Sequence, residues 1–270
     1  MHGLGNDFVI LDRISHPEIE ITAALAEQLG DRHFWVGCDQ ILVIEPSESY
    51  DYKYRIYNQD GSEVEMCGNW ARCFLQYIHE KWLTDRSEVH VETAKGKIIL
   101  KTDGKNIMVD MWAPILSDTR IPVRNSIRTI MAEGREFHFI PVSMGNPHAV
   151  IFLEENLKDF PVEKFGKVIE NTLDIFPRKV NVEFVSVLSP THIDMRVWER
   201  GAWETHACGT WACAWVVAGI LSSQLTKNTS IQVSLRWGDL SISWSGNPSE
   251  SVMMSGPATT VFHGEYILLD

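Results

Sequence analysis

Two cysteines, Cys67 and Cys208, each stand at the start of a predicted helix, directly before a Gly–polar–Trp–Ala sequence. A thiol at a helix start faces free backbone N–H groups and the positive end of the helix dipole. Both effects lower the thiol pKa from about 8.5 toward neutrality and make a thiolate accessible. The same N–H groups can hold a carboxylate. The pair therefore predicts inversion of an amino acid: one thiolate removes the α-proton and the opposite thiol delivers a proton to the other face, with no metal or pyridoxal cofactor.

Other uses of cysteine stay open beside this one. Zinc would need different ligand spacings and a nearby pair of histidines. A Cys–His hydrolase would need one nucleophile and an orienting base, and His206 near Cys208 has no counterpart beside Cys67. A Cys67–Cys208 disulfide can form on oxidation and would be an inactivated form. The other three cysteines are predicted to be buried structural residues: Cys38, Cys73 and Cys213.

An internal repeat places the two cysteines at equivalent points of the chain. Residues 55–71 read RIYNQDGSEVEMCGNWA and residues 196–212 read RVWERGAWETHACGTWA, with Arg and Cys twelve residues apart in both. LGNDFVI and MGNPHAVI form a second matching pair. The offset is 140 residues from Asn6 to Asn146 and 141 between the two cysteines. Two matches in one order at nearly one offset predict a duplicated chain with two similar halves.

The hydrophobic pattern predicts the elements that position these residues. Residues 52–58 and 192–198 alternate as strands do, whereas the stretch after each cysteine is typical of a helix. The helix after Cys208 is apolar on every side, which predicts burial. Surface helices are expected at 22–30, ending at a C-capping Gly30, and at 162–171. Further short strands are expected at 40–45, 89–93, 97–102, 106–111, 148–153, 182–188, 231–235, 240–244 and 261–269.

The predicted fold class is therefore α+β. Each of the two pseudo-symmetric halves is expected to be a curved, mostly antiparallel sheet wrapped around a central helix. We expect the N-terminal half, with Cys67, to comprise residues 1–113 and a returning strand at 260–270. The C-terminal half, with Cys208, would comprise residues 114–259.

Composition limits the classes of function. The chain has 270 residues, 44% of them apolar, and a net charge of −12 without a Lys/Arg cluster, which argues against nucleic acid or an anionic membrane as a partner. MHGLGNDF lacks the basic start and apolar run of a signal peptide, and no stretch has the length of a transmembrane helix. Five cysteines suggest reduced thiols. We expect a cytoplasmic globular protein.

The sequence resembles the diaminopimelate epimerase family over nearly its whole length. The motifs that carry the resemblance occur in the family's order: HGLGNDFVILD, DRHFWVGCDQIL, RIYNQDGSEVEMCGNWARC, VSMGNPHAVIF, ERGAWETHACGTWAC and MSGPATTVFHGEY. The resemblance implies two pseudo-symmetric α+β halves, interconversion of LL- and meso-diaminopimelate in lysine and peptidoglycan-precursor synthesis, no cofactor, and a homodimer. The chain begins at HGLGNDF, where family members have a few more residues, so we expect a weakened first strand.

The resemblance also implies the roles of particular residues. Cys67 and Cys208 match the acid/base cysteines, and His148 and Glu199 match a polar pair near them. Gly68–Asn69 and Gly209–Thr210 match carboxylate-binding turns. The residues that match substrate-binding positions are Asn6, Gln40, Asn58, Asn146, Asn181, Glu199 and Arg200. Such amide, acid and arginine groups suit a substrate with a zwitterion at each end.

One departure from the family's motifs is systematic. Trp70, Trp203 and Trp211 stand where the motifs have glycine. The same pattern extends to Trp35, Trp82, Trp112, Trp215 and Trp237, whereas Trp198 and Trp244 are expected to be ordinary tryptophans. Turns that use glycine often need a positive φ or a close backbone approach, and overpacking one buried site costs about 1–3 kcal/mol. Our hypothesis is a reassigned UGA codon that the source organism reads as glycine.

Two alternative functions remain. If the tryptophans are genuine and fill the cleft, the protein would be a catalytically silent binding module. A racemase of the proline or hydroxyproline type is the alternative enzyme. The set of asparagines favours diaminopimelate, because the smaller substrates lack a distal amino-carboxylate group.

Overall fold

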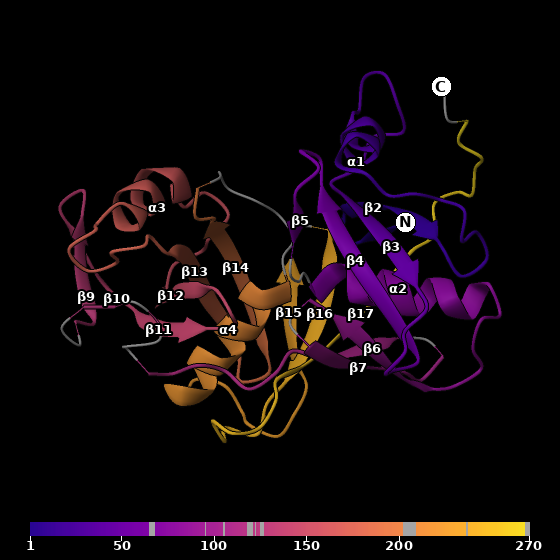
Figure 1. Cartoon of the computed structure of the whole chain (residues 1–270). Coiled ribbons are helices and arrows are strands. Elements are labelled where there is room, and N and C mark those ends of the chain that lie inside the picture. The colour runs from indigo at the N-terminus through magenta and orange to yellow at the C-terminus, as the bar shows by residue number, and fades with distance from the viewer. Residues whose placement is uncertain are drawn as a thin grey trace. The chain divides into compact units, whose positions relative to one another are not determined.

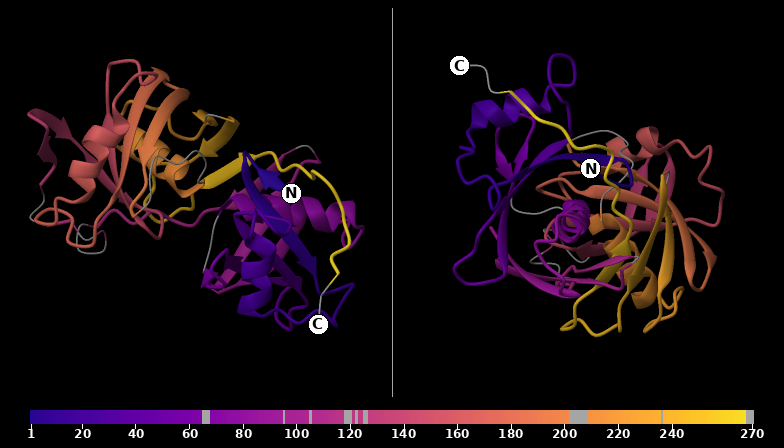
Figure 2. Two further views of the ribbon diagram at one scale, coloured as in Figure 1. Left: turned by 90° about the horizontal axis from the view of Figure 1, so that it is seen from above. Right: turned by 90° about the vertical axis from the view of Figure 1, so that its right-hand side faces the viewer.

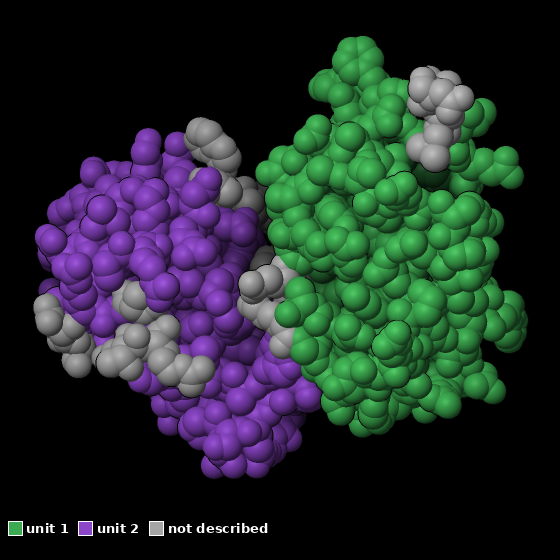
Figure 3. Space-filling view, viewed as in Figure 1, with its two compact units in different colours: residues 1–109, 256–270 green, residues 110–255 purple. Residues whose placement is uncertain are grey.

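The computed structural model describes residues 1–64, 68–94, 96–104, 106–117, 121, 123–124, 127–201, 209–235 and 237–267. The chain divides into two compact units (Figure 3). Unit 1 comprises residues 1–109 and 256–270, and unit 2 comprises residues 110–255. In the described part of the chain, no helix is long and apolar enough to cross a membrane.

Unit 1 contains a sheet with the strand order β1-β2-β3-β4-β6-β7-β8, and β5 pairs with β4 (Figure 1). Its strands are β1 (His2–Gly3), β2 (Asn6–Asp12), β3 (Gln40–Glu45), β4 (Tyr52–Asn58), β5 (Glu63–Val64), β6 (Glu88–Thr93), β7 (Gly96–Thr102) and β8 (Ile107–Asp110). Its helices are α1 (Ala23–Gly30) and α2 (Gly68–Glu80). Figure 2 shows the strands of this unit curving around α2.

Unit 2 contains a sheet with the strand order β11-β12-β13-β14-β15-β16-β17 and a separate hairpin, β9–β10. Its strands are β9 (Thr129–Ala132), β10 (Arg135–His138), β11 (Ile140–Ser143), β12 (Pro147–Phe152), β13 (Asn181–Ser189), β14 (His192–Trp198), β15 (Ile231–Leu235), β16 (Gly238–Ser243) and β17 (Met253–Gly256). Its helices are α3 (Val162–Glu170) and α4 (Gly209–Leu221).

The two sheets repeat one pattern of strand directions. β2 and β3 pair in parallel, as β12 and β13 do, and the next pairs, β3–β4 and β13–β14, are antiparallel. β4–β6 and β14–β15 are again parallel. The remaining pairs within the two sheets, including the two outer hairpins β6–β7 and β15–β16, are antiparallel. The α+β fold class predicted from the sequence is confirmed, and its duplication extends to the strand topology.

Helices on both faces explain why the inner strands are apolar throughout. Along β3, Ile41, Leu42, Val43 and Ile44 are all buried, and α1 and α2 both contact this strand. A strand covered on both faces has a continuous apolar run in place of alternation. In α4, every residue from Gly209 to Ile220 is buried, as its all-round apolar sequence predicted.

Two sequence-based predictions about local structure were wrong. Gly30 is the last residue of α1 and has no positive φ, and the C-cap is Asp31. A Cβ at Gly30 would lie 3.0 Å from the Cα of Gln59, so close packing explains this glycine. The strand expected at 261–269 is absent from its described residues, 261–267. Residues 261–267 pair with no described strand, although their sequence is partly apolar. The nearest pairing is one bridge between Thr259 and His2.

Candidate active site

The predicted site residues of unit 1 gather at one edge of its sheet, beside the start of its central helix. β2 begins at Asn6 and the parallel strand β3 begins at Gln40, while the antiparallel strand β4 ends at Asn58. Strand directions therefore bring the three side chains to the same edge. The helix α2 begins at Gly68, and Gly68 and Asn69 are both buried.

Hydrogen bonds join these side chains in two pairs. Asn69 Nδ2 donates to Asn6 Oδ1 over 3.2 Å, and Asn6 Nδ2 donates to Asp39 Oδ2 over 2.9 Å. Gln40 Nε2 donates to Asn58 Oδ1 over 3.0 Å. Asp39, which directly precedes Gln40, was not predicted and links the two pairs. The structure thus brings all the described site residues of unit 1 together.

Asp39 belongs to a charged cluster at the same edge. The guanidinium of Arg32 donates to both carboxylate oxygens of Asp7, over 2.9 and 2.7 Å, and to Asp39 Oδ1 over 2.7 Å. Although burial alone would raise the pKa of Asp7, the bonds from Arg32 and from the backbone of Asp39 hold it below its usual range. Arg32 therefore joins Asp7 to Asp39, the carboxylate that accepts from Asn6.

Unit 2 repeats this arrangement at the matching edge. Asn146 directly precedes β12, Asn181 is the first residue of β13, and Glu199 follows the last residue of β14. The helix α4 begins at Gly209, and Gly209 and Thr210 are buried. Because β12 and β13 are parallel and β14 is antiparallel, these positions again share one edge.

Asn181 fixes the turn that carries the predicted arginine. Its Nδ2 donates to the carbonyl of Pro147 over 3.1 Å, and its Oδ1 accepts from the backbone N–H of Arg200 over 2.8 Å. The next residue, Gly201, has a φ of 74° and donates its N–H to Glu170 Oε1 over 2.9 Å. Asn181 therefore holds the turn through its side chain, and Glu170 is an anchor that sequence reasoning missed.

His148 lies in a buried hydrogen-bonded chain. Its Nδ1 is 2.6 Å from Glu183 Oε1, and its Nε2 is 2.9 Å from Asn146 Oδ1. The side chains of His148 and Glu183 are both 0% exposed. Glu183 was also missed, although a single acid in the apolar run NVEFVSV was a usable signal.

The two cysteines predicted to transfer protons, Cys67 and Cys208, lie outside the described residues, as does Trp203. The described chain resumes directly after each cysteine, at the first residue of α2 and of α4. The other cysteines, Cys38, Cys73 and Cys213, are buried, as predicted for structural residues. Burial raises the pKa of Cys38 to about 11, which keeps this thiol protonated.

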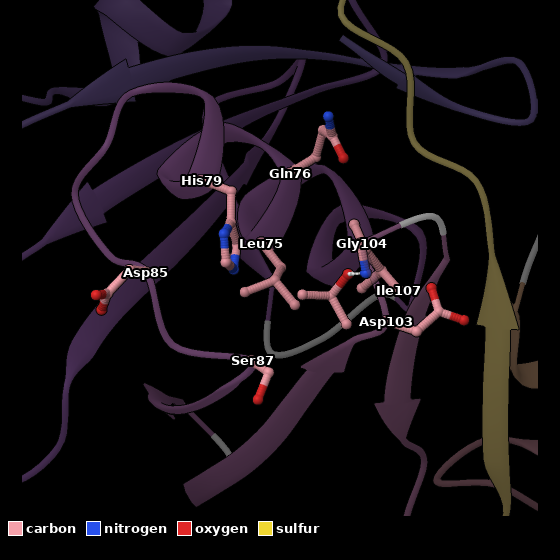
Figure 4. A pocket seen from close by; sticks show the side chains of 9 residues that line it. Leu75, Gln76, His79, Asp85, Ser87, Asp103, Gly104 and Ile107 are labelled. Carbon is pink, nitrogen blue, oxygen red and sulfur yellow. Dashed lines mark hydrogen bonds between the residues drawn. The ribbon is translucent and has the colours of Figure 1, made fainter.

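A pocket of about 440 Å³ lies elsewhere in unit 1, near the last turns of α2 (Figure 4). None of the predicted site residues lines it. Its lining consists of Leu75, Gln76, His79, Asp85, Ser87, Thr102, Asp103, Gly104 and Ile107. Figure 4 shows the His79 ring beside Leu75. The Gly104 N–H donates to Thr102 Oγ1 over 3.0 Å. This pocket is therefore separate from the sheet edge of unit 1.

Comparison with solved structures identifies the class of fold. A phenazine biosynthesis protein of the PhzF family from Bacillus anthracis has a TM-score of 0.68 at 15% identity, covering 95% of this chain and 91% of that chain. A probable proline racemase from Agrobacterium radiobacter K84 has a TM-score of 0.65 at 14% identity, covering 92% and 81%. A hydroxyproline epimerase from Agrobacterium vitis has a TM-score of 0.60 at 13% identity, covering 85% and 76%. The duplicated α+β fold is thus the one found in racemases and epimerases.

Sequence comparison identifies the family within this class. The family model for diaminopimelate epimerase matches residues 1–116 and 140–261. The diaminopimelate epimerase of Azoarcus sp. (strain BH72) is 48% identical over 273 residues, which cover 98% of this chain and 96% of that protein. The enzyme of the same description from Methanococcus maripaludis (strain C6) is 42% identical over 98% of this chain and 97% of that protein. The chain belongs to the diaminopimelate epimerase family and is an isomerase of the epimerase type.

Proposed function

We propose that this protein interconverts LL- and meso-diaminopimelate by proton transfer at the α-carbon, with Cys67 and Cys208 as the acid/base pair. The carrying observation is the repeated arrangement of the two units. In each unit, a central helix begins directly after one of these cysteines in the sequence, and amide side chains gather at one edge of the sheet. In unit 1, Asn69 at the helix start is bonded to one of these amides, Asn6. Family membership over nearly the whole chain supports the substrate.

In the proposed reaction, one thiolate takes the α-proton and becomes a thiol. The electron pair left on the α-carbon is stabilised through the adjacent carboxylate, which the backbone N–H groups at the starts of α2 and α4 bind. The opposite thiol then gives its proton to the other face of the carbon and becomes the thiolate. Configuration is inverted, and the two cysteines have exchanged protonation states without any cofactor.

The amides and Arg200 would bind the distal end of the substrate, which carries an ammonium and a carboxylate. Amide oxygens accept from the ammonium, while amide N–H groups and the guanidinium donate to the carboxylate. The residues that would serve are Asn6, Gln40, Asn58, Asn146, Asn181 and Arg200. We further propose that the enzyme acts in the cytoplasm as a homodimer.

The direct test is exchange of the α-proton of LL-diaminopimelate in D₂O, followed by NMR. The chain as written would be measured beside a chain with Trp70, Trp203 and Trp211 replaced by glycine. We expect exchange by the glycine chain, reduced about 10²–10⁴-fold or more in Cys67→Ser and in Cys208→Ser. The matched control is Cys73→Ser, because Cys73 is a buried cysteine of α2, the helix that follows Cys67 in the sequence.

The outcome also decides between the alternatives. Absence of exchange in both chains, with both folded by circular dichroism, would overturn the proposal and leave a binding module. Exchange of the α-proton of proline or hydroxyproline, and not of diaminopimelate, would assign the alternative racemase activity. Sedimentation equilibrium of the same samples tests the homodimer.

A further inference from the structure

A buried series of hydrogen bonds, Glu183–His148–Asn146, sets the orientation of the Asn146 amide at the edge of unit 2. The Glu183 carboxyl is the first member, and its Oε2 has no hydrogen-bond partner among the described residues. Its Oε1 faces His148 Nδ1, and His148 Nε2 faces Asn146 Oδ1. A buried carboxyl with one oxygen unpaired is poorly placed to carry a charge.

Burial shifts the pKa of both Glu183 and His148 toward their neutral forms. It raises the pKa of the Glu183 carboxyl well above its ordinary value, although a bond from the backbone of Ala149 lowers it, and the nearby Glu199 carboxylate raises it further. It lowers the pKa of His148 to about 3, and Arg200 lowers it further, so the ring is neutral near pH 7. Asn146 Oδ1 can only accept, so the imidazole proton resides on Nε2. Nδ1 of the neutral ring must then accept, and the Glu183 carboxyl 2.6 Å away is its donor.

We propose that Glu183 is a positioning residue that acts through His148 to fix the Asn146 amide, with its Nδ2 donors turned away from the histidine and available to substrate. The opposite histidine tautomer would carry its proton on Nδ1 and accept at Nε2. Asn146 would then have to turn its Nδ2 toward the ring and its oxygen outward. An outward oxygen repels a substrate carboxylate, whereas outward N–H groups bind it.

This proposal rests on the proposed function, and two variants separate it from a merely structural role. In Glu183→Leu, Nδ1 loses its donor. In the control Glu183→Gln, the side-chain amide can still donate to Nδ1. The readouts are the tautomer of His148 by ¹⁵N NMR and the steady-state constants for diaminopimelate in the chain that shows exchange.

We expect Glu183→Leu to lose the pure Nε2–H tautomer and to raise KM about tenfold or more, whereas Glu183→Gln stays within about threefold of the parent. A folded Glu183→Leu with an unchanged tautomer and an unchanged KM would overturn the proposal. If the parent chain shows no exchange at all, the proposed function fails, and the tautomer measurement alone decides whether Glu183 sets the state of His148.

A second inference concerns the tryptophans and stands independently of the function. Three of them are buried, and their indole Nε1 atoms have no hydrogen-bond partner in the part of the chain that the structure describes: Trp70, Trp211 and Trp215. The two tryptophans expected to be ordinary have partners. Trp198 Nε1 donates to Glu170 Oε2 over 2.8 Å, and Trp244 Nε1 donates to the carbonyl of Glu250 over 3.1 Å. Buried indole N–H groups usually find a partner, so the first three do not fit their sites.

Steric fit also distinguishes Trp70 from Trp198. The ring centroid of Trp70 is 3.7 Å from that of Tyr54 at an interplanar angle of 67°, whereas favourable aromatic pairs have centroids about 4.5–7 Å apart. Trp198 in contrast packs on Gly166, whose missing Cβ leaves room for the indole. A residue without a side chain at position 70 would remove the overlap with Tyr54.

The backbone conformation at Trp82 and at Trp112 is one that favours glycine. Trp82 has a φ of 57° just after α2, and Trp112 has a φ of 61°. The Trp82 N–H bonds to the carbonyl of His79, and the Leu83 N–H bonds to the carbonyl of Ile78. This is the Schellman motif, with Trp82 at the left-handed C′ position, where glycine is the usual residue. The Trp82 side chain is 90% exposed, so no packing compensates for the strain.

We infer that the codons written here as Trp70, Trp82, Trp112, Trp211 and Trp215 are translated as glycine in the source organism, and that Trp198 and Trp244 are genuine tryptophans. The gene and the protein test this without any assay of activity. UGA codons at the first five positions with UGG at the last two, and glycine-containing peptides in mass spectra of the native protein, are expected. UGG at the five positions, or tryptophan in their native peptides, would overturn the inference.

Variants of the chain as written give a second measurement. Trp82→Gly should raise the midpoint of urea unfolding by a few tenths of a molar, since glycine accepts the positive φ without strain. Trp70→Gly should also raise it. Trp198→Gly and Trp244→Gly are the controls and should lower it, because they remove hydrogen-bonded, buried side chains. A fall for Trp70→Gly as large as for the controls would mean that the tryptophan fits its site.

Discussion

Two polar side chains, Asn181 and Glu170, accept hydrogen bonds from the turn after β14. The Glu170 carboxylate accepts from Trp198 Nε1, from the Gly201 N–H and from Lys179 Nζ. Burial alone would raise the pKa of Glu170, but these three donors outweigh it and lower the pKa below its ordinary value. The charged form is therefore the one that the folded protein stabilises.

The first prediction concerns this charge. Because the folded pKa of Glu170 is lowered, its contribution to stability is present above the unfolded pKa of about 4.3 and is lost as pH falls through the folded value. Glu170→Gln should lower the free energy of unfolding by about 1–3 kcal/mol at pH 7 and by less at pH 3. Urea unfolding at both pH values measures this, with the exposed Glu163→Gln on the same helix as the control. Equal losses at both pH values would contradict it.

The sequence predicted the neutral residues of the site better than its acids. Asn6, Asn146 and Asn181 were singled out because they match substrate-binding positions of the family that the sequence resembles. Asp39, Glu170 and Glu183 were missed because their partners come from other elements. Residue spacing within one strand or helix cannot predict a bond between two elements. The bond between Trp198 on β14 and Glu170 on α3 is an example.

Among the elements, the packing of α3 on β14 depends on one glycine. Gly166 lies in the middle of α3, and a Cβ there would lie 2.6 Å from Trp198 Cγ. The helix can therefore approach the strand closely enough for Glu170 to reach the Trp198 indole. The surrounding core cluster includes the aromatic rings of Phe137, Phe165 and Phe184.

The second prediction follows from this close approach. Gly166→Ala should destabilise the protein by about 1–3 kcal/mol, because the added methyl overlaps the indole. Alanine is the better helix former by about 1 kcal/mol, so propensity alone predicts the opposite sign. Urea unfolding decides between the two, and the exposed Lys167→Ala serves as the control with an expected change near zero.

Element positions were largely predictable because apolar period and turn residues are local. The central helices α2 and α4 were expected directly after the two cysteines and begin there. The strand expected at 261–269 was wrong over its described residues, since pairing depends on whether a neighbouring strand has a free edge. Gly30 was likewise read from local rules, whereas its reason is contact with Gln59.

Over the whole molecule, a segment remote in sequence completes unit 1. The N–H of His2 donates to the carbonyl of Thr259, and the N–H of Thr259 donates back to the carbonyl of His2, both over 2.9 Å. Arg72, fully buried on α2, donates its Nε to the carbonyl of Pro257 over 3.1 Å and its Nη2 to Asn69 Oδ1 over 3.1 Å. One arginine thus joins the segment around Pro257 to a predicted carboxylate-binding turn.

The third prediction concerns that arginine. Arg72→Met keeps much of the apolar stem but removes both bonds, so the amides of His2 and Thr259 should exchange with solvent at least about tenfold faster. Peptides of unit 2 should be unchanged, because β11 to β16 have their own core. Hydrogen exchange with mass spectrometry measures both. Uniformly faster exchange in both units would mean that the two units open together.

The pairing of His2 with Thr259 also dictates an order of events on the ribosome. All of unit 2, residues 110–255, leaves the exit tunnel before Pro257 and Thr259 do. Unit 2 can therefore fold its core during synthesis. Unit 1 cannot be completed until residues 256–270 have been made, although its first strands are synthesised earliest. The half whose first strands are translated earliest is therefore the half that is completed last.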